Sequence, residues 1–205
     1  MKVMVLGAKG MLGSDLCEAL AGEHEVIGVD LDDFDITKPA SVGQGIAAAR
    51  PEMVIHCAAW TDVDGCERDP ARAFEQNAGG TWNVAAAAAD VGASVVYMST
   101  DFVFDGAKGE PYTEFDVPNP LSVYGASKLA GEEAVRRLVP RHTIARTAWL
   151  YGGRGKNFVS SILKAAAERE EIKVVADQFG SPTYTRDLAQ AIADLVVTGR
   201  LFPGT

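Results

Sequence analysis

The sequence lacks the features that define several large classes of protein. No apolar run approaches the roughly 20 residues that a membrane-spanning helix needs, and no export signal separates Met1 from the first predicted strand. Cysteine is scarce. The sequence has an odd number of cysteines, Cys17, Cys57 and Cys66, and they lack the paired spacing of a zinc site. We therefore expect a cytoplasmic chain with free thiols, no membrane segment and no zinc site.

Positive charge is also in short supply. The 19 Lys and Arg residues stand against 28 Asp and Glu residues, which gives a formal net charge of -9. A nucleic-acid-binding protein usually carries a basic patch, and none is visible, so we expect no nucleic acid partner. The acidity favours solubility and means that an anionic substrate needs specific local cations.

Short apolar runs alternate with helical patterns along most of the chain. Helices are predicted from Met11 and over 39–50, 70–91, 124–138, 157–169 and 186–197, with Gly199 as a stop signal; strands are predicted over 2–6, 25–29, 53–57, 95–98, 143–150 and 172–175. A loop is predicted over 177–184. The alternation predicts an α/β fold with a doubly wound, mostly parallel, Rossmann-type sheet and helices on both faces.

A glycine-rich turn joins the first predicted strand to the helix that begins at Met11. Gly7, Gly10 and Gly13 have the spacing Gly-x-x-Gly-x-x-Gly, which differs from the Gly-x-Gly-x-x-Gly of the standard dinucleotide fingerprint. Glycine lets backbone N–H groups approach a pyrophosphate, and a helix N-terminus adds partial positive charge. The strand-turn-helix context favours nucleotide binding over a tight turn whose glycines are only structural.

Asp30 ends the second predicted strand, about where an acid meets the adenosine ribose hydroxyls in dinucleotide-binding folds. An acid there favours a free 2′-hydroxyl and hence NADH, and no Arg follows to receive a 2′-phosphate. Lys9 could partly do so, which leaves NADPH open. The alternative is an ordinary loop carboxylate, because Asp32, Asp33 and Asp35 crowd the same loop.

Tyr124 and Lys128 share one face of a predicted helix whose N-cap is Ser122. A phenol titrates near 10, and a nearby ammonium lowers that pKa, so Tyr124 could give a proton to an alkoxide that forms on a carbonyl carbon. Thr100, just past a buried strand, could hydrogen-bond the same oxygen. The pair alone is weak evidence, because such spacing arises by chance on amphipathic helices.

Two further features accompany the predicted nucleotide site. Ala58, Ala59, Trp60 and Thr61 follow the third predicted strand, where small residues admit either a flat ligand or a packed helix. Asn77 lies inside a predicted helix, where Asn is unfavourable. Its side chain therefore either braces a neighbouring backbone or faces water.

Several longer blocks occur in an order that is more specific than any single motif. They are Cys57-Ala58-Ala59-Trp60-Thr61-x-Val63-Asp64-x-x-Glu67, Ser99-Thr100-Asp101-x-Val103-Phe104-Asp105-Gly106, Tyr124-Gly125-x-x-Lys128, Arg146-Thr147-x-Trp149-x-Tyr151 and Asp177-Gln178-x-Gly180-x-Pro182-Thr183. With these blocks, the sequence resembles the extended short-chain dehydrogenase/reductase superfamily. Within it, the sequence is similar to the dTDP-4-dehydrorhamnose reductase family from Met1 to about Thr205.

The resemblance implies an oxidoreductase that reduces the C4 ketone of a dTDP-linked keto sugar with hydride from NADH or NADPH. Tyr124 would donate the proton, Lys128 would hold the nicotinamide ribose and tune Tyr124, and Thr100 would complete the catalytic set. Thr100, Asp101 and Trp149 would contact the sugar. The implied cofactor-binding residues are Gly7, Gly10, Met11, Leu12, Gly13, Asp30, Asp35, Ile36, Ala58, Ala59, Trp60, Thr61, Asn77, Tyr124 and Lys128.

The resemblance also bears on the organisation of the chain. Family members continue past Thr205, so we expect a dinucleotide-binding domain over 1–147 and a partial substrate-binding lobe over 148–205. Some members bind Mg2+ through carboxylates, one of them in the extension, and we place no metal here. A homodimer is compatible with the resemblance.

Two other functions stay open. One is an epimerase or dehydratase of the same superfamily, although dehydratases usually carry an Asp-Glu pair where this sequence has Thr100-Asp101. The other is a non-catalytic subunit that binds a nicotinamide cofactor, like the regulatory subunit of methionine adenosyltransferase. A damaged catalytic set would mark such a subunit, whereas Thr100, Tyr124 and Lys128 are all present.

Overall fold

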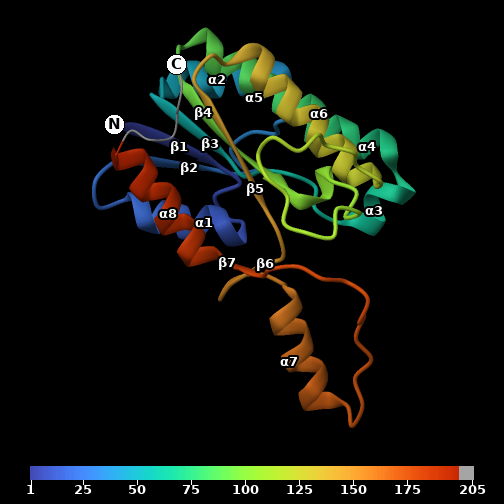
Figure 1. The fold of residues 1–205 in the computed structure, drawn as a ribbon. Helices are drawn as coiled ribbons and strands as arrows, with labels where there is room; N and C mark the ends of the chain where they lie inside the picture. Colours follow the sequence, from blue (N-terminus) through green and yellow to red (C-terminus); the bar gives the residue numbers. More distant parts are fainter. Residues whose placement is uncertain (199–205) are drawn as a thin grey trace.

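The computed structural model describes residues 1–198 and contains a five-stranded sheet in the order β2-β1-β3-β4-β5, with every neighbouring pair parallel (Figure 1). The strands are β1 (Lys2–Leu6), β2 (Glu25–Val29), β3 (Met53–His56), β4 (Ser94–Thr100) and β5 (His142–Thr147). This order places the switch in winding direction between β1 and β3, where doubly wound folds bind ligands beyond the carboxyl ends of the strands. The predicted α/β fold with a parallel sheet is confirmed.

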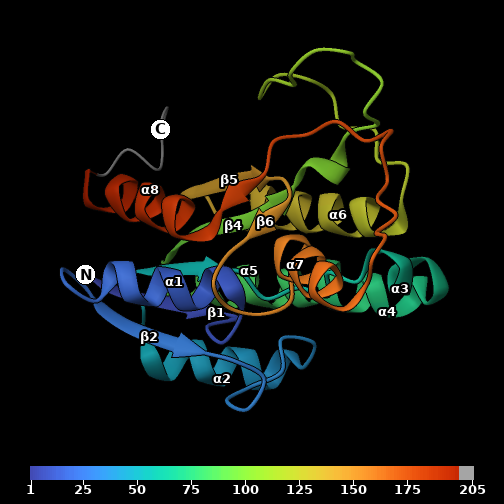
Figure 2. The same ribbon diagram turned by 90° about the horizontal axis from the view of Figure 1, so that it is seen from below.

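The central strands are apolar on both faces because helices cover both sides of the sheet. In β1, Val3 and Val5 join one core cluster, and Met4 and Leu6 join the other. The first cluster lies under two helices, α1 (Met11–Leu20) and α8 (Thr185–Thr198). The second lies under α2 (Pro39–Ala49), α5 (Gly80–Asp90) and α6 (Val123–Leu138) (Figures 1 and 2).

One predicted helix is not continuous in the structure. The expected helix over 70–91 consists of α4 (Pro70–Phe74), a π-helical turn η1 (Glu75–Gly79) and α5. A further short helix, α3 (Val63–Arg68), was not predicted, and Asp62 caps it by accepting a hydrogen bond from the Gly65 N–H at 3.0 Å. Pattern reasoning could not detect the π turn, because its apolar spacing differs little from that of an α-helix.

The strand predicted over 172–175 is wrong. The segment has no regular structure, and Val174 and Val175 are 51% and 66% exposed. An apolar run forms a strand only where a neighbouring strand accepts its backbone hydrogen bonds. The Gly199 stop signal lies outside the described residues.

The predicted strand over 143–150 ends early, at Thr147. Trp149 adopts a left-handed backbone with φ of +47°, and the chain then forms β6 (Leu150–Tyr151), which pairs in parallel with β7 (Thr183–Tyr184). The predicted loop over 177–184 therefore ends in a short strand. Beyond β6, α7 (Phe158–Glu168) projects away from the sheet, and none of its residues is buried (Figure 1).

The long connection between β4 and α6 begins with η2, a 3-10 turn at Asp101–Val103. It is ordered by Asp105, whose carboxylate accepts hydrogen bonds from the Ala107 N–H, the Asn119 amide and the Tyr112 hydroxyl at 2.9, 3.0 and 2.7 Å. These bonds, with that of Ala107 the largest effect, lower the Asp105 pKa to about 2. Asp105, which belongs to the sequence block from Ser99 to Gly106, therefore organises the loop that follows Thr100 and Asp101.

Across residues 1–198, no helix is both long enough and apolar enough to cross a bilayer.

Candidate functional site

The glycine-rich turn after β1 is sterically specified. Gly7 has φ of +79°, and a Cβ atom there would lie 2.9 Å from the backbone nitrogen of Ala58. A Cβ atom at Gly13 would lie 2.1 Å from the carbonyl oxygen of Gly7, which itself accepts a 3.0 Å hydrogen bond from the Gly10 N–H. Side chains at 7 and 13 would therefore displace the turn.

The first turn of α1 leaves backbone donors available. Gly10 caps the helix without a side-chain hydrogen bond, and the first bond along the helix runs from the Ser14 N–H to the Gly10 carbonyl at 3.0 Å. The N–H groups of Met11, Leu12 and Gly13 therefore have no partner within the helix. Leu12 can offer only its backbone, because its side chain is buried in the core. This helix end suits a phosphate group.

A cavity of about 360 Å³ lies at the carboxyl ends of β1, β2 and β3, beside this turn. It brings together six residues predicted to bind cofactor: Gly7, Gly10, Asp30, Ile36, Ala58 and Ala59. Sequence reasoning missed Leu31, Phe34 and Gln76, which also line the cavity. Of these three, only Phe34 could have been noticed in the sequence, because it is an aromatic residue in a loop rich in Asp.

Asp30 sits at the cavity with its carboxylate held by the backbone. Its Oδ2 atom accepts from the Lys9 N–H at 2.8 Å and its Oδ1 atom accepts from the Leu31 N–H at 2.9 Å. The Lys9 ammonium forms an ion pair with Asp32, and the hydrogen bond that it donates to Asp32 is the main reason why the Lys9 pKa is raised. Lys9 is thus already engaged, which weakens its case as a receptor for a 2′-phosphate.

The other residues predicted to bind the cofactor differ in burial and in whether they line the cavity. Ile36 is buried, and its carbonyl accepts a 2.9 Å hydrogen bond from Asn83. Asp35 does not line the cavity and instead accepts from the backbone and hydroxyl of Thr37, both at 2.8 Å. Thr61 is exposed.

Asn77 braces a neighbouring backbone, and the alternative that it faces water is wrong. Its side chain is 1% exposed and bonds both backbone groups of Trp60, accepting from the N–H at 2.8 Å and donating to the carbonyl at 3.0 Å. It also donates to the Ser127 hydroxyl at 3.0 Å, and Ser127 donates to the Tyr124 carbonyl at 2.8 Å. Asn77 therefore links the segment after β3 to helix α6, from a π turn of the kind often found at functional sites.

Tyr124 and Lys128 lie on the buried face of α6, as their spacing predicts. The Lys128 Nζ atom donates to the Met98 carbonyl at 2.8 Å and lies 4.1 Å from the centre of the Tyr97 ring. At the start of the helix, Ser122 caps the Gly125 N–H at 3.0 Å, as predicted, and Glu67 accepts from the Val123 N–H at 2.7 Å. Glu67 belongs to a quoted sequence block but had no assigned role.

Thr100 ends β4 close to Tyr124. Its hydroxyl donates to Asp101 at 3.1 Å and accepts from the Phe102 N–H at 3.2 Å. The Phe102 ring meets the Tyr124 ring edge to face at 5.6 Å. A Cβ atom at Gly125 would lie 2.1 Å from the Phe102 carbonyl, so this glycine lets α6 approach the end of β4.

The pKa values of the pair only partly follow the expectation. Burial raises the pKa of Tyr124, and the opposing effect of Lys128 is smaller, so the predicted net lowering is wrong. Burial likewise lowers the pKa of Lys128 to about 8, against opposing effects of Tyr124, Cys57 and Glu132. Near neutral pH, Tyr124 thus holds its proton beside a largely cationic Lys128.

The three residues predicted to contact the sugar lie in different surroundings. Thr100 is buried, and burial raises the pKa of Asp101. Trp149 lies at the junction between β5 and β6, is 43% exposed and packs against Gly180, where a Cβ atom would meet its ring at 3.0 Å. Within residues 1–198, no three His, Cys, Asp or Glu side chains are grouped so that they could hold a metal ion.

Comparisons with known proteins show the family to which the chain belongs and the relatives of its fold. The family model described as the RmlD substrate binding domain matches residues 1–201. A dTDP-4-dehydrorhamnose reductase of Burkholderia thailandensis is 42% identical over 198 residues, which are 97% of this chain and 66% of the relative. The chain thus spans about two thirds of that curated relative.

Two crystal structures share the fold closely. The dTDP-4-dehydrorhamnose reductase of Clostridium acetobutylicum superposes with a TM-score of 0.94 at 46% identity, covering 98% of this chain and 71% of that one. The Bacillus anthracis dTDP-4-dehydrorhamnose reductase, solved in complex with NADP, has a TM-score of 0.93 at 47% identity, covering 96% of this chain and 70% of that one.

Proposed function

The chain belongs to the RmlD substrate binding domain family, and from this premise we propose that it reduces dTDP-4-dehydro-L-rhamnose to dTDP-L-rhamnose with NADH or NADPH. One observation carries the proposal: Thr100, Tyr124 and Lys128 meet where β4 and α6 approach each other. The reaction would take place in the cytoplasm, and a homodimer is the assembly we propose.

The residues of the glycine-rich turn fit a dinucleotide. Side chains are sterically excluded at Gly7 and Gly13, the α1 N–H groups are free for a pyrophosphate, and the cavity beside them carries Asp30. Asp30 would accept from a ribose hydroxyl, with Ile36 beside the adenine. The Ala59 to Thr61 segment, fixed by Asn77, would lead toward Lys128. The cofactor supplies the hydride, and the protein supplies binding, orientation and the proton.

Within this arrangement, the side chains handle the proton. Tyr124 would donate its hydroxyl proton to the sugar carbonyl oxygen as the carbon gains hydride, which leaves an alcohol and a phenolate. Lys128 would stabilise that phenolate by its charge and hold the nicotinamide ribose. Thr100 would donate a hydrogen bond to the same sugar oxygen, with Asp101 and Trp149 contacting the sugar.

We propose that residues 1–147 form the dinucleotide-binding domain and 148–205 part of the substrate-binding lobe. The sheet ends with β5 at Thr147, and β6, β7 and α7 extend away from it (Figure 1). Helix α8, the last described element of the lobe, packs against α1 in the core of the nucleotide-binding sheet. The lobe is thus anchored at both ends on the nucleotide-binding sheet.

Turnover of dTDP-4-dehydro-L-rhamnose by purified protein that carries the complete substrate-binding lobe tests the proposal. We expect one equivalent of reduced cofactor to be oxidised for each dTDP-L-rhamnose formed, measured by nicotinamide absorbance and mass spectrometry. Isomerisation or dehydration without net cofactor oxidation would instead indicate an epimerase or dehydratase. Cofactor binding with no chemistry would indicate the regulatory role.

Cofactor preference tests the Asp30 assignment. We expect NADH to bind at least as tightly as NADPH in calorimetric titrations, because a carboxylate disfavours a 2′-phosphate. Asp32→Asn should improve NADPH binding selectively, since it releases the Lys9 ammonium from its ion pair. An unchanged chain that prefers NADPH by tenfold or more would contradict the role of Asp30.

The turn offers a steric test. Gly13→Ala places a methyl group 2.1 Å from the Gly7 carbonyl, so we expect cofactor affinity to fall at least about tenfold and stability to fall by about 1–3 kcal/mol. Gly22→Ala is the control, because a Cβ atom there meets nothing within 4 Å. Calorimetry and thermal unfolding measure both effects, and equal behaviour of the two variants would show that the turn tolerates displacement.

A further inference from the structure

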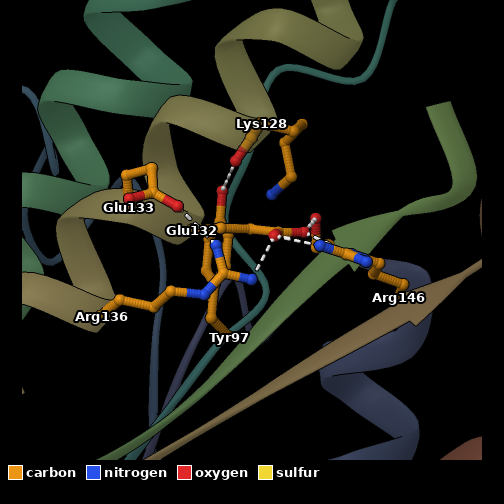
Figure 3. Close-up of polar contacts among 7 residues, drawn as sticks. Tyr97, Lys128, Glu132, Glu133, Arg136 and Arg146 are labelled. Atoms are coloured by element: carbon orange, nitrogen blue, oxygen red, sulfur yellow. Dashed lines mark hydrogen bonds and ion pairs between the residues drawn. The ribbon is translucent and has the colours of Figure 1, made fainter. Parts of the chain in front are cut away.

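Glu132 is an ionised group buried in the protein that the mechanism above does not use. Its side chain is 0% exposed, and its Oε1 atom accepts from the Ser99 hydroxyl at 2.6 Å and from Arg146 Nε at 2.9 Å. Its Oε2 atom accepts from Arg146 Nη2 at 2.7 Å and from Arg136 Nη2 at 2.9 Å (Figure 3). Apolar residues of similar size often stabilise a fold as well as a buried ion pair does, so a gain in stability is weak grounds for burying this carboxylate.

The partners of Glu132 lie next to the proposed catalytic residues. Glu132 is one helical turn beyond Lys128 on α6. Ser99 stands on β4 between Met98, whose carbonyl accepts from Lys128 Nζ, and Thr100. Arg146 is the register partner of Ser99 on β5. The carboxylate thus ties α6 to β4 and β5 at the level of Thr100 and Lys128.

Glu132 also supplies charge to this region. Burial alone would raise its pKa, but the hydrogen bonds from Arg146 and Ser99 hold the pKa below its ordinary value, so the side chain is ionised at neutral pH. The titratable groups that interact with Lys128 come from three elements: Tyr124 and Glu132 on α6, Tyr97 on β4, and His56 and Cys57 at the end of β3. Among these groups, Glu132 is the carboxylate, and its charge favours the Lys128 cation.

We propose that Glu132 is a positioning residue, which fixes α6 against β4 through Ser99 and Arg146 and keeps Lys128 cationic beside Tyr124. The inference rests on the proposed reductase function for its kinetic consequences. Its electrostatic consequence can be measured without turnover, because Lys128 titrates whether or not substrate is converted.

Glu132→Gln is the central variant, since it removes the charge and nearly preserves the shape. We expect the pKa of Lys128 to fall below that of the unchanged chain, measured by NMR titration of 13C-labelled lysine with Lys128→Met to assign the signal. Because Lys128 would then lose its proton at lower pH, the alkaline limb of kcat/KM should move to lower pH. We expect kcat to fall by about 10- to 100-fold through misplacement of the reacting groups.

Glu133→Gln is the matched control. It makes the same chemical change one residue along the helix, where the half-exposed carboxylate pairs with Arg136 at 2.7 Å. We expect neither the Lys128 titration nor the pH profile to change. Glu132→Gln combined with Arg146→Met removes the guanidinium left unpaired, so the Lys128 pKa should return toward its original value.

Two outcomes would overturn the proposal. One is an unmoved Lys128 titration in folded Glu132→Gln protein, and the other is the same shift in Glu133→Gln. If Glu132→Gln does not fold, Ser99→Ala tests the positioning role, because it removes the hydrogen bond between Glu132 and β4 without removing a charge. We expect several-fold lower kcat with similar KM from Ser99→Ala, and unchanged kcat would refute positioning. Absence of turnover in protein that carries the complete substrate-binding lobe refutes the reductase function and leaves the titration test standing.

Discussion

We expect replacement of Tyr124 by Phe to lower kcat for keto-sugar reduction by about 100- to 10,000-fold, the range contributed by a positioned general acid. The variant keeps the ring that packs against Phe102 and removes only the hydroxyl. Burial raises the pKa of Tyr124, so the hydroxyl carries its proton throughout the neutral range. Cofactor affinity should stay similar, because the change leaves the turn and the cavity intact.

Steady-state kinetics and calorimetry measure the two parts of this prediction. Tyr112→Phe provides the control, since it removes another hydroxyl, one that bonds Asp105 at 2.7 Å in the loop before α6. We expect that variant to retain most of its activity. Substantial activity in Tyr124→Phe would require another group, such as Asp101, to be the acid.

The parts of the site that the sequence predicts are those dictated by local sterics and spacing. The need for Gly7 and Gly13 could be predicted because no other residue fits so close to a neighbouring backbone. The proximity of Tyr124 and Lys128 could be predicted because a helix places residues four apart on one face. The prediction that they act together with Thr100 needed the longer sequence blocks, since no local rule connects β4 to α6.

The features that escaped prediction depend on partners distant in the chain. A Glu on a helix is usually solvent-exposed, so no feature of the sequence indicated that Glu132 accepts hydrogen bonds from Arg146 and Ser99. The two interpretations of Asn77 could be separated only by the position of Trp60. The net effect on the Tyr124 pKa needed the extent of burial, which spacing cannot supply.

The last prediction concerns Lys128, whose buried charge is proposed to serve catalysis but destabilises the fold. The folded protein lowers its pKa from 10.5 to about 8, so below pH 8 the buried cation destabilises the fold. Between about pH 8 and 10.5 the unfolded chain binds more protons than the folded one, and stability rises with pH. Catalysis should decline over the same window, because Lys128 loses the charge that we propose stabilises the Tyr124 phenolate and holds the nicotinamide ribose.

Lys128→Met removes this titration. We expect kcat and cofactor affinity both to fall in the variant, because Lys128 is assigned the ribose contact as well as the charge beside Tyr124.

We also expect the free energy of unfolding of the unchanged protein, relative to the variant, to rise by about 3 kcal/mol from pH 7 to 10.5. Urea unfolding of both proteins across this range isolates Lys128, since the other groups are common to both. Lys164→Met, at an exposed position on α7, should run parallel to the unchanged protein. If the two stability curves of the unchanged protein and Lys128→Met ran parallel as well, Lys128 would not be a buried cation with a lowered pKa, and its proposed influence on Tyr124 would lose its physical basis.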